Sequence, residues 1–302
     1  GLYQSALDIL QSRDRIPSGS LTRGGFVDNF WQDADHVRGI WRRTTLASYN
    51  TANPVWETIL DFDALSASEG ANWVYKGANC LEPEERYCLI SLSNGGKDAT
   101  TLREFDTVER KFVEGGFTFE ESKSGFAWVD RDTLLISDAF TEANQTTSGY
   151  SRVVRILKRG QSVAEAPIVY EGKAEDMAIS AYVLRDADGV AKGTFIRRAI
   201  DFYSSETFAL KADGSVVAVP LPAKGGISAL VAGKLVISTD EDWTAPSGQQ
   251  FKTGDIFAYD IDAWLADNTV QAQMIISPGE REAVERISAT RNKLIIALYE
   301  NV

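Results

Sequence analysis

Short apolar runs separated by polar turns make up most of the sequence. Segments rich in Val, Ile, Leu, Phe, Tyr and Trp alternate with turns rich in Gly, Asp, Asn and Ser, a texture typical of all-β proteins. The first sixteen residues differ, because Leu2, Ala6 and Ile9 recur at helical spacing and Pro17 follows them. The pattern predicts one short helix within residues 1–16 and strands thereafter.

Two series of apolar segments repeat along the chain at intervals of about 50 residues. Segments of the first series alternate apolar and polar positions, as in a strand with one buried face, and a polar turn follows each. Segments of the second series are continuous apolar triplets, which indicate strands buried on both faces. The first series comprises residues 59–63, 102–106, 154–158, 208–211 and 257–260, and the second comprises residues 88–90, 134–136, 194–196, 235–237 and 294–296.

A repeating unit of this length holds about four strands, which is the size of one blade of a β-propeller. A β-sandwich or a β-helix is the alternative, because every all-β protein has strands separated by about 8–12 residues. Six or so units fit into the 302 residues. The last of them, residues 291–300, stops after its buried strand, so we expect a propeller that is incomplete at its C-terminus.

Several segments resemble the N-terminal propeller domain of the prolyl oligopeptidase family of serine peptidases. The first reads NFWQDADHVRGIWRRT at residues 29–44, and the second reads WVYKGA at residues 73–78. The resemblance extends through residues 92–99, 103–106, 112–117, 127–135 and 158–160. It covers nearly all of the chain from about residue 20 onward, and the order and spacing of the segments carry it more than any single motif.

This resemblance implies a seven-bladed propeller seated on an α/β-hydrolase domain. We therefore expect residues 1–20 to be a helical lead-in that belongs with the hydrolase domain, and residues 21–302 to be the propeller. Six or so of the seven blades would lie in this chain. The seventh blade and the hydrolase domain of the same polypeptide would follow it.

The residues needed for serine-hydrolase chemistry do not occur together in the sequence. The Gly-x-Ser-x-Gly motif that lifts a nucleophilic serine on a strand-to-helix turn is missing, and the nearest segment, residues 226–230, lacks its second glycine. His36 is the only histidine, close to Asp33 and Asp35. We interpret it as a polar group at a strand entrance rather than a general base. We expect no catalytic, cofactor-binding or metal-binding residue in this chain, and no cofactor.

Acidic pairs raise the possibility of a propeller glycosidase, which uses two carboxylates. Asp240 and Asp242 would share one face of a strand, and Trp243 could serve as a sugar platform. Glu120 and Glu121 are adjacent and would face opposite sides of a strand. A charged turn is the commoner meaning of such runs. The seven tryptophans are spread over the predicted blades, as core-filling side chains would be.

The two cysteines, Cys80 and Cys88, flank a turn that contains Glu and Pro. Both fall at the ends of apolar segments, so neighbouring strands can bring them together and a disulfide is possible. With so few cysteines, a pair of reduced, half-buried thiols is the interpretation that we favour. A metal site is less favoured, because the sequence has one histidine and no Cys-x-x-Cys motif.

Charge and hydropathy exclude several classes of partner. The net charge is −12 and the basic residues are scattered, so we expect no nucleic-acid surface and no binding to anionic membranes. No apolar run is long enough to span a membrane, and the N-terminal residues do not resemble a signal peptide. We expect a cytoplasmic protein, with a periplasmic or secreted one as the alternative.

The resemblance implies a parent protein that is a serine endopeptidase cleaving short proline-containing peptides. The propeller would be a non-catalytic gate that admits short peptides and excludes folded proteins. The alternative is a free-standing propeller that acts as a binding or scaffold module, and a glycosidase is a third possibility. We expect the chain alone to be inactive, and to self-associate if it exposes strand edges.

Overall fold

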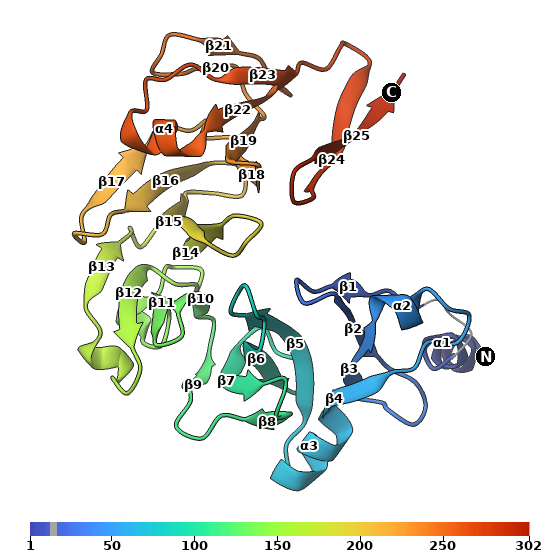
Figure 1. The fold of residues 1–302 in the computed structure, drawn as a ribbon. Coiled ribbons are helices and arrows are strands. Elements are labelled where there is room, and N and C mark those ends of the chain that lie inside the picture. Colours follow the sequence, from blue (N-terminus) through green and yellow to red (C-terminus); the bar gives the residue numbers. More distant parts are fainter. Residues whose placement is uncertain (13–16, 302) are drawn as a thin grey trace. The chain divides into compact units, whose positions relative to one another are not determined.

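The computed structural model describes residues 1–12 and 17–301. The chain divides into two compact units, Gly1–Lys123 and Ser124–Val302. Strands dominate both units (Figure 1). The helix predicted within residues 1–16 is present as α1 (Leu2–Leu10), and it has no buried residue. Residues 13–16, which were included in that prediction, lie outside the described residues.

The first unit contains two antiparallel sheets, which we call blades 1 and 2. Blade 1 has the order β1-β2-β3-β4, and blade 2 has the order β5-β6-β7-β8 with β9 also paired to β7. The strands of blade 1 are β1 (Ser20–Leu21), β2 (Phe26–Trp31), β3 (Ile40–Thr45) and β4 (Glu57–Asp61). Those of blade 2 are β5 (Trp73–Cys80), β6 (Tyr87–Asn94), β7 (Thr100–Asp106), β8 (Lys111–Phe112) and β9 (Thr118–Ser122). The short helix α2 (Leu46–Tyr49) lies between β3 and β4, and the short helix α3 (Phe62–Glu69) connects blade 1 to blade 2.

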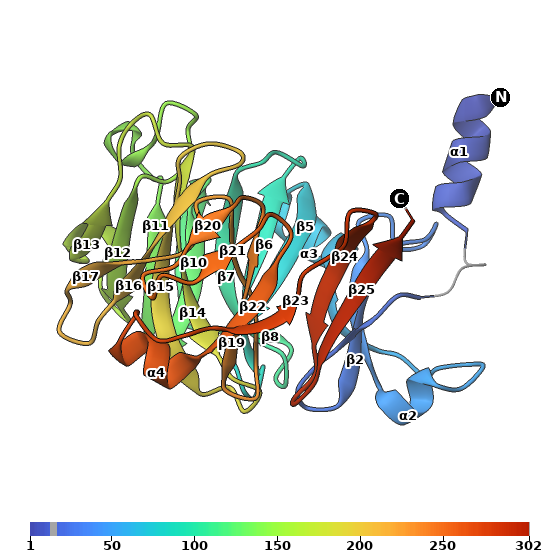
Figure 2. The ribbon, with the colours of Figure 1, turned by 90° about the horizontal axis from the view of Figure 1, so that it is seen from above.

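The second unit contains three four-stranded sheets, blades 3, 4 and 5. Blade 3 is formed by β10 (Gly125–Asp130), β11 (Thr133–Asp138), β12 (Val153–Lys158) and β13 (Ile168–Glu171). Blade 4 is formed by β14 (Ala178–Arg185), β15 (Ala191–Ala199), β16 (Ser205–Leu210) and β17 (Val216–Val219). Blade 5 is formed by β18 (Gly225–Val231), β19 (Lys234–Thr239), β22 (Ile256–Asp260) and β23 (Gln273–Ile276). Its insertions are the hairpin of β20 (Trp243–Thr244) and β21 (Gln250–Phe251) and the helix α4 (Ile261–Ala266), which follows β22 (Figure 2).

The all-β propeller architecture and the short N-terminal helix are confirmed, but the number of blades was wrong. The described residues contain five blades rather than six or so. The segment counted as a sixth unit forms only β24 (Glu282–Ala289) and β25 (Leu294–Glu300), which pair with each other in a two-stranded sheet (Figure 1). An apolar triplet predicts one strand and does not show how many strands accompany it.

The two predicted series of segments correspond to particular strands of the blades. The apolar triplets are the second strands β6, β11, β15 and β19, followed by β25. The alternating segments are mostly third strands, namely β7, β12, β16 and β22. Residues 59–63 differ, because they cross from the fourth strand β4 into α3.

Helices replace the polar turns expected after two of these strands. In both places the sequence is Asp, an apolar residue and Asp, and the first carboxylate caps the helix. The Asp61 side chain accepts a hydrogen bond from Ala64 N, and the Asp260 side chain accepts one from Ala263 N. Such caps satisfy backbone groups at a helix start. The apolar residue between the two aspartates is buried in each case.

The hydrophobic cores lie between consecutive sheets within each unit. Trp41 of blade 1 packs in one cluster with Ile90 and Phe105 of blade 2. In the second unit, Leu135 of blade 3 shares a cluster with Ile196 of blade 4. Two further clusters join blade 4 to blade 5 and blade 5 to the β24–β25 sheet. Within each unit, consecutive sheets therefore bury their faces against each other, which explains why the second strands are rich in apolar residues.

Candidate functional site

His36, which was considered as a general base, lies in the loop between β2 and β3. Its Nδ1 atom is 3.0 Å from Oδ1 of Asp33, and the same oxygen accepts hydrogen bonds from the backbone N–H groups of Asp35 and His36. Oδ2 of Asp33 accepts a hydrogen bond from the indole of Trp31. Burial by itself would raise the pKa of Asp33, but these hydrogen bonds from Trp31 and His36 hold it well below its usual range. The charged Asp33 thus organises the loop, with the His36 ring held against it.

The serine of residues 226–230 lies within a strand. Ser228 belongs to β18, and its hydroxyl lies 2.8 Å from the hydroxyl of Ser238 on β19. A nucleophile elbow needs a strand-to-helix turn instead. The partner of Ser228 is therefore another hydroxyl rather than a base.

Asp240 and Asp242, considered for a glycosidase, do not share one face of a strand, because they lie in the turn between β19 and β20. Oδ1 of Asp242 accepts a hydrogen bond from the backbone N–H of Thr253. Trp243 is not presented as a sugar platform, because its ring stacks on Phe251 and Phe257 at centroid distances of 5.9 and 5.8 Å. Those rings belong to the core between blades 4 and 5. This arrangement does not favour the glycosidase interpretation.

The other acidic pair lies on β9 of blade 2. Glu121 forms an ion pair of 2.9 Å with Lys97, and both side chains are substantially exposed. Glu120 is also exposed. Their arrangement is that of a solvated strand face.

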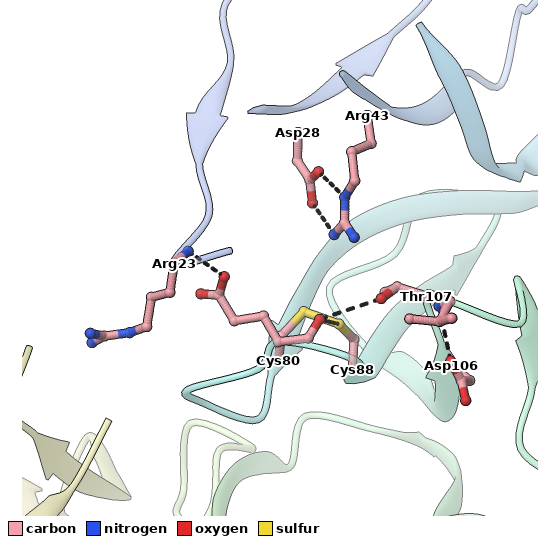
Figure 3. Close-up of a disulfide and its surroundings, with 9 residues drawn as sticks. Arg23, Asp28, Arg43, Cys80, Cys88, Asp106 and Thr107 are labelled. Atoms are coloured by element: carbon pink, nitrogen blue, oxygen red, sulfur yellow. Dashed lines mark hydrogen bonds and ion pairs between the residues drawn. A yellow bond between two sulfur atoms is a disulfide. The ribbon is translucent and has the colours of Figure 1, made fainter. Parts of the chain in front are cut away.

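The two cysteines form a disulfide, so the favoured interpretation as reduced thiols was wrong. Cys80 and Cys88 are direct partners across the β5–β6 ladder, with their Cα atoms 3.9 Å apart. Figure 3 shows the bond at the closed end of this hairpin. The sequence signal was the placement of both cysteines at the inner ends of strands that share one tight hairpin. The prediction gave more weight to the small number of cysteines than to this placement.

A cavity of about 630 Å³ lies beside the disulfide in the first unit, with Phe30, Tyr75 and Cys80 among its lining residues. Two of its charged side chains, Asp28 and Arg43, pair with each other, and Glu82 and Glu85 also line it. Arg43 donates two hydrogen bonds to Asp28 (Figure 3). Burial, aided by the nearby charge of Asp28, raises the pKa of Tyr75 to about 12. Aromatic side chains and mainly acidic charged side chains therefore line this cavity.

The strand β18 of the second unit begins with two glycines. Gly225 and Gly226 have φ values of 138° and 145°, a conformation that other residues rarely adopt. A Cβ atom on Gly225 would also lie 2.3 Å from the carbonyl oxygen of Ser238. A glycine is thus required at position 225, because a side chain there would clash with the backbone of β19.

Two cavities lie along β18, with volumes of about 540 and 600 Å³. They share Ser228, Ser238 and Asp240 as lining residues. We call the pair the β18 groove. It runs from the loop after β15 to β24, whose Glu282 and Arg286 line its far end. Because β18 is the edge strand of blade 5, the groove follows a strand edge, where an extended peptide can add hydrogen bonds.

A short loop between β15 and β16 presents two aromatic rings at the near end of the β18 groove. Phe202 is 84% exposed and Tyr203 is 81% exposed, and both line the cavity there. Asp201 holds this loop by accepting hydrogen bonds from the backbone N–H groups of Tyr203 and Ser204 and from the Ser204 hydroxyl. These bonds lower the pKa of Asp201, with the Ser204 hydroxyl as the largest cause. The aromatic pair was not singled out from the sequence, since Phe-Tyr within a β-rich chain normally signals a strand.

Two further features of residues 1–12 and 17–301 concern metal binding and membrane insertion. No group of three or more His, Cys, Asp and Glu side chains there is arranged to hold a metal ion. In the same residues no helix is long and apolar enough to cross a membrane.

The family is decided by a comparison with models of known protein families. The model of the prolyl oligopeptidase N-terminal β-propeller domain matches residues 2–302. The chain belongs to this family. The resemblance found in the sequence is therefore confirmed, and the sheets described above are blades of a prolyl oligopeptidase propeller.

Relatives of this propeller include peptidases from two bacteria. An uncharacterized peptidase of Sinorhizobium fredii is 41% identical over 99% of the chain, which covers 42% of that protein. An uncharacterized peptidase of Rickettsia prowazekii is 29% identical over 93% of the chain, which covers 41% of that protein. The chain thus spans less than half the length of these peptidases.

Solved structures agree with this assignment. A post-proline cleaving enzyme from Rickettsia typhi is 27% identical and superposes with a TM-score of 0.90, covering 99% of this chain and 45% of that one. Prolyl oligopeptidase B from Galerina marginata shares the fold with a TM-score of 0.64 at 16% identity, over 99% of this chain and 46% of that one.

Proposed function

We propose that this chain is the non-catalytic propeller of a longer serine endopeptidase that cleaves short proline-containing peptides. The observation that carries the proposal is the family match over residues 2–302, together with relatives that are peptidases of more than twice this length. A C-terminal α/β-hydrolase domain of the same polypeptide would supply the nucleophile, the base and the orienting acid. The propeller would act as a filter that admits short peptides and excludes folded proteins.

The side chains of the propeller support a binding role rather than a chemical one. The ring of its only histidine contacts a carboxylate, and Ser228 contacts another hydroxyl. The β18 groove instead offers a strand edge, two exposed aromatic rings and hydroxyl groups. These are features that hold an extended peptide without reacting with it.

The experiment compares the chain alone with the longer polypeptide on a chromogenic succinyl-Gly-Pro substrate. We expect the longer polypeptide to hydrolyse it and the purified 302-residue chain to release no chromophore above the buffer rate. Measurable turnover by the chain alone, surviving further purification, would overturn the non-catalytic assignment. The reading frame beyond Val302 should encode one or more further blades and a Gly-x-Ser-x-Gly segment.

The alternative function is a free-standing binding or scaffold module. A stop codon directly after Val302 would favour it, and the same result would contradict the peptidase proposal. We also propose that the 302-residue chain self-associates through exposed strand edges, of which β25 is one. Light scattering that gives a concentration-independent monomer would contradict this.

The compartment is proposed as the cytoplasm, with the periplasm or the cell exterior as the alternative. The Cys80–Cys88 bond favours the alternative, because disulfides persist mainly in oxidising compartments. Thiol labelling of protein taken directly from cells distinguishes the two. Two free thiols fit the cytoplasm, and none fits the alternative.

A further inference from the structure

A third cavity in the second unit lies between blades 3 and 4 and is separate from the β18 groove. Its volume is about 420 Å³, within the range of small-molecule sites. Three lysines line it from three places in the sequence: Lys158 at the end of β12, Lys192 on β15 and Lys211 directly after β16. Its apolar wall is formed by side chains at the edge of the core between the two blades, namely Val129, Leu135, Ile156 and Leu210.

The three ammonium groups are weakly neutralised. Lys158 donates a hydrogen bond of 2.7 Å to the hydroxyl of Thr133, which is a neutral partner. Lys192 lies 3.9 Å from Asp186, at the outer limit of an ion pair. Among residues 17–301, no hydrogen bond or ion pair is found for the ammonium of Lys211.

The two carboxylates that interact with Lys192 and Lys211, those of Asp186 and Asp213, also accept hydrogen bonds within their own turns. Oδ1 of Asp186 accepts hydrogen bonds from the backbone N–H groups of Asp188 and Val190. Asp213, which follows Lys211 in the turn, accepts from both the backbone and the hydroxyl of Ser215. None of the residues that line the cavity is an aspartate or a glutamate.

This concentration of positive charge stands out against a chain with a net charge of −12. Like charges gathered around one opening repel one another, and an anion placed between them removes that repulsion. The aliphatic wall adds a second requirement, because burying it against a bare inorganic ion would yield no hydrophobic stabilisation. A ligand that suits both features carries its charge at one end and an apolar body at the other.

We propose that the lysine-rimmed cavity between blades 3 and 4 binds an organic anion, a carboxylate attached to an aliphatic or aromatic body. The carboxylate contacts Lys158, Lys192 and Lys211, and the apolar body packs on Ile156 and Leu210. The same chemistry is presented by the C-terminal residue of a peptide and by a free organic acid. This site does not depend on the proposed peptidase function, since no hydrolytic step takes part in it.

The test is a nuclear magnetic resonance titration of the 302-residue chain with three probes. N-acetyl-leucine carries the carboxylate and the apolar body, and N-acetyl-leucinamide is its uncharged counterpart. We expect saturable shifts at residues around the cavity with N-acetyl-leucine, and at least about tenfold weaker binding of the amide, since one charged hydrogen bond contributes roughly that factor. The third probe, 4-methylpentanoate, lacks the peptide group. Equal affinity for it indicates a free organic acid as the natural ligand, and weaker affinity indicates a peptide C-terminus.

Two variants and a matched control tie the binding to this cavity. Lys211→Gln removes an exposed charge whose ammonium forms no hydrogen bond or ion pair among residues 17–301, and Lys158→Gln removes the lysine that Thr133 positions. Each should weaken N-acetyl-leucine binding about tenfold. Lys252→Gln makes the same charge change at an exposed position away from the cavity and should leave affinity unchanged. Should Lys158→Gln not fold, Lys211→Gln alone decides.

Three results would overturn the proposal. One is the absence of saturable shifts with N-acetyl-leucine at millimolar concentration. Another is equal binding of the acid and its amide. The third is an equal loss of affinity in Lys252→Gln and Lys211→Gln, which would mean that only the overall charge matters.

Discussion

The strands β19 and β25 carry nearly the same sequence pattern but occupy opposite environments. In both, an apolar triplet directly follows a lysine, which is Lys234 in β19 and Lys293 before β25. In β19 the triplet is completely buried, with Leu235, Val236 and Ile237 all at 0% exposure. In β25 the middle residue of the triplet, Ile295, is 53% exposed.

The difference comes from the neighbours of each strand rather than from the strand itself. β19 lies between β18 and β22, with cores on both faces of its sheet. Among residues 1–12 and 17–301, β25 pairs only with β24, and the cluster shared with blade 5 packs against that sheet. An apolar triplet therefore indicates that a strand can be buried on both faces. The number of sheets packed against the strand determines how much of the triplet is buried.

We expect the largest difference in stability when one isoleucine of each triplet is replaced by alanine. Ile237→Ala leaves a cavity in a closed core and should lower the free energy of unfolding by about 3 kcal/mol. Ile295→Ala removes the same atoms from a half-exposed position and should cost less than about 1 kcal/mol. Urea unfolding of both variants measures the difference. Equal losses would mean that the β24–β25 sheet is packed as tightly as blade 5.

Two ion pairs of the second unit differ in burial in the same way as the two triplets. Asp176 and Arg198 form a pair of 2.8 Å with exposures of 3% and 14%, whereas Asp188 and Arg291, next to β25, are 60% and 71% exposed. Breaking the buried pair with Asp176→Asn should cost about 3 kcal/mol. Asp188→Asn should cost less than about 1 kcal/mol. Thermal melts at neutral pH test this, and similar losses in the two variants would contradict it.

The buried pair also predicts the response to acid. Burial by itself would raise the pKa of Asp176, but the hydrogen bond and charge of Arg198 lower it below the ordinary value of 3.8. Its contribution to stability is therefore complete above that value and is lost as the pH falls below it. The difference in stability between the wild-type chain and Asp176→Asn should shrink below about pH 4. A difference that stayed constant down to pH 2 would exclude this linkage.

A smaller effect distinguishes the two hairpins, β5–β6 and β24–β25. Only the first is closed by a disulfide. Replacing both cysteines by alanine should lower the free energy of unfolding by about 2 kcal/mol, because the bond restricts only a short loop of the unfolded chain. Adding a reductant to the wild-type chain should give a similar loss in urea unfolding. No change under either condition would mean that the thiols are not bonded in the folded protein.

The sequence predicted the repeating architecture well, because periodicity reports which faces of a strand are buried. The positions of the second strands followed from their apolar triplets, and most third strands followed from alternating segments. The count of blades failed at residues 291–300, where the pattern cannot report the number of partner strands. The helices after Asp61 and Asp260 were missed because a capping aspartate and a polar turn look alike in sequence.

The candidate site was less accessible to sequence reasoning. The placement of His36 beside Asp33 could be predicted, since the two residues are three positions apart in the sequence. The β18 groove was not, because it joins the loop at Phe202 to Ser238 and Glu282, which only folding brings near one another. The lysine-rimmed cavity was not predictable for the same reason, because its three lysines come from β12, from β15 and from the turn after β16.

The central claim is that the propeller filters substrates by size while another domain breaks the bond. It is tested most directly by giving the longer polypeptide one proline-containing sequence in two forms, as a free short peptide and within a surface loop of a folded protein. We expect rapid cleavage of the peptide and no detectable cleavage of the folded protein. Cleavage of both at similar rates would contradict it.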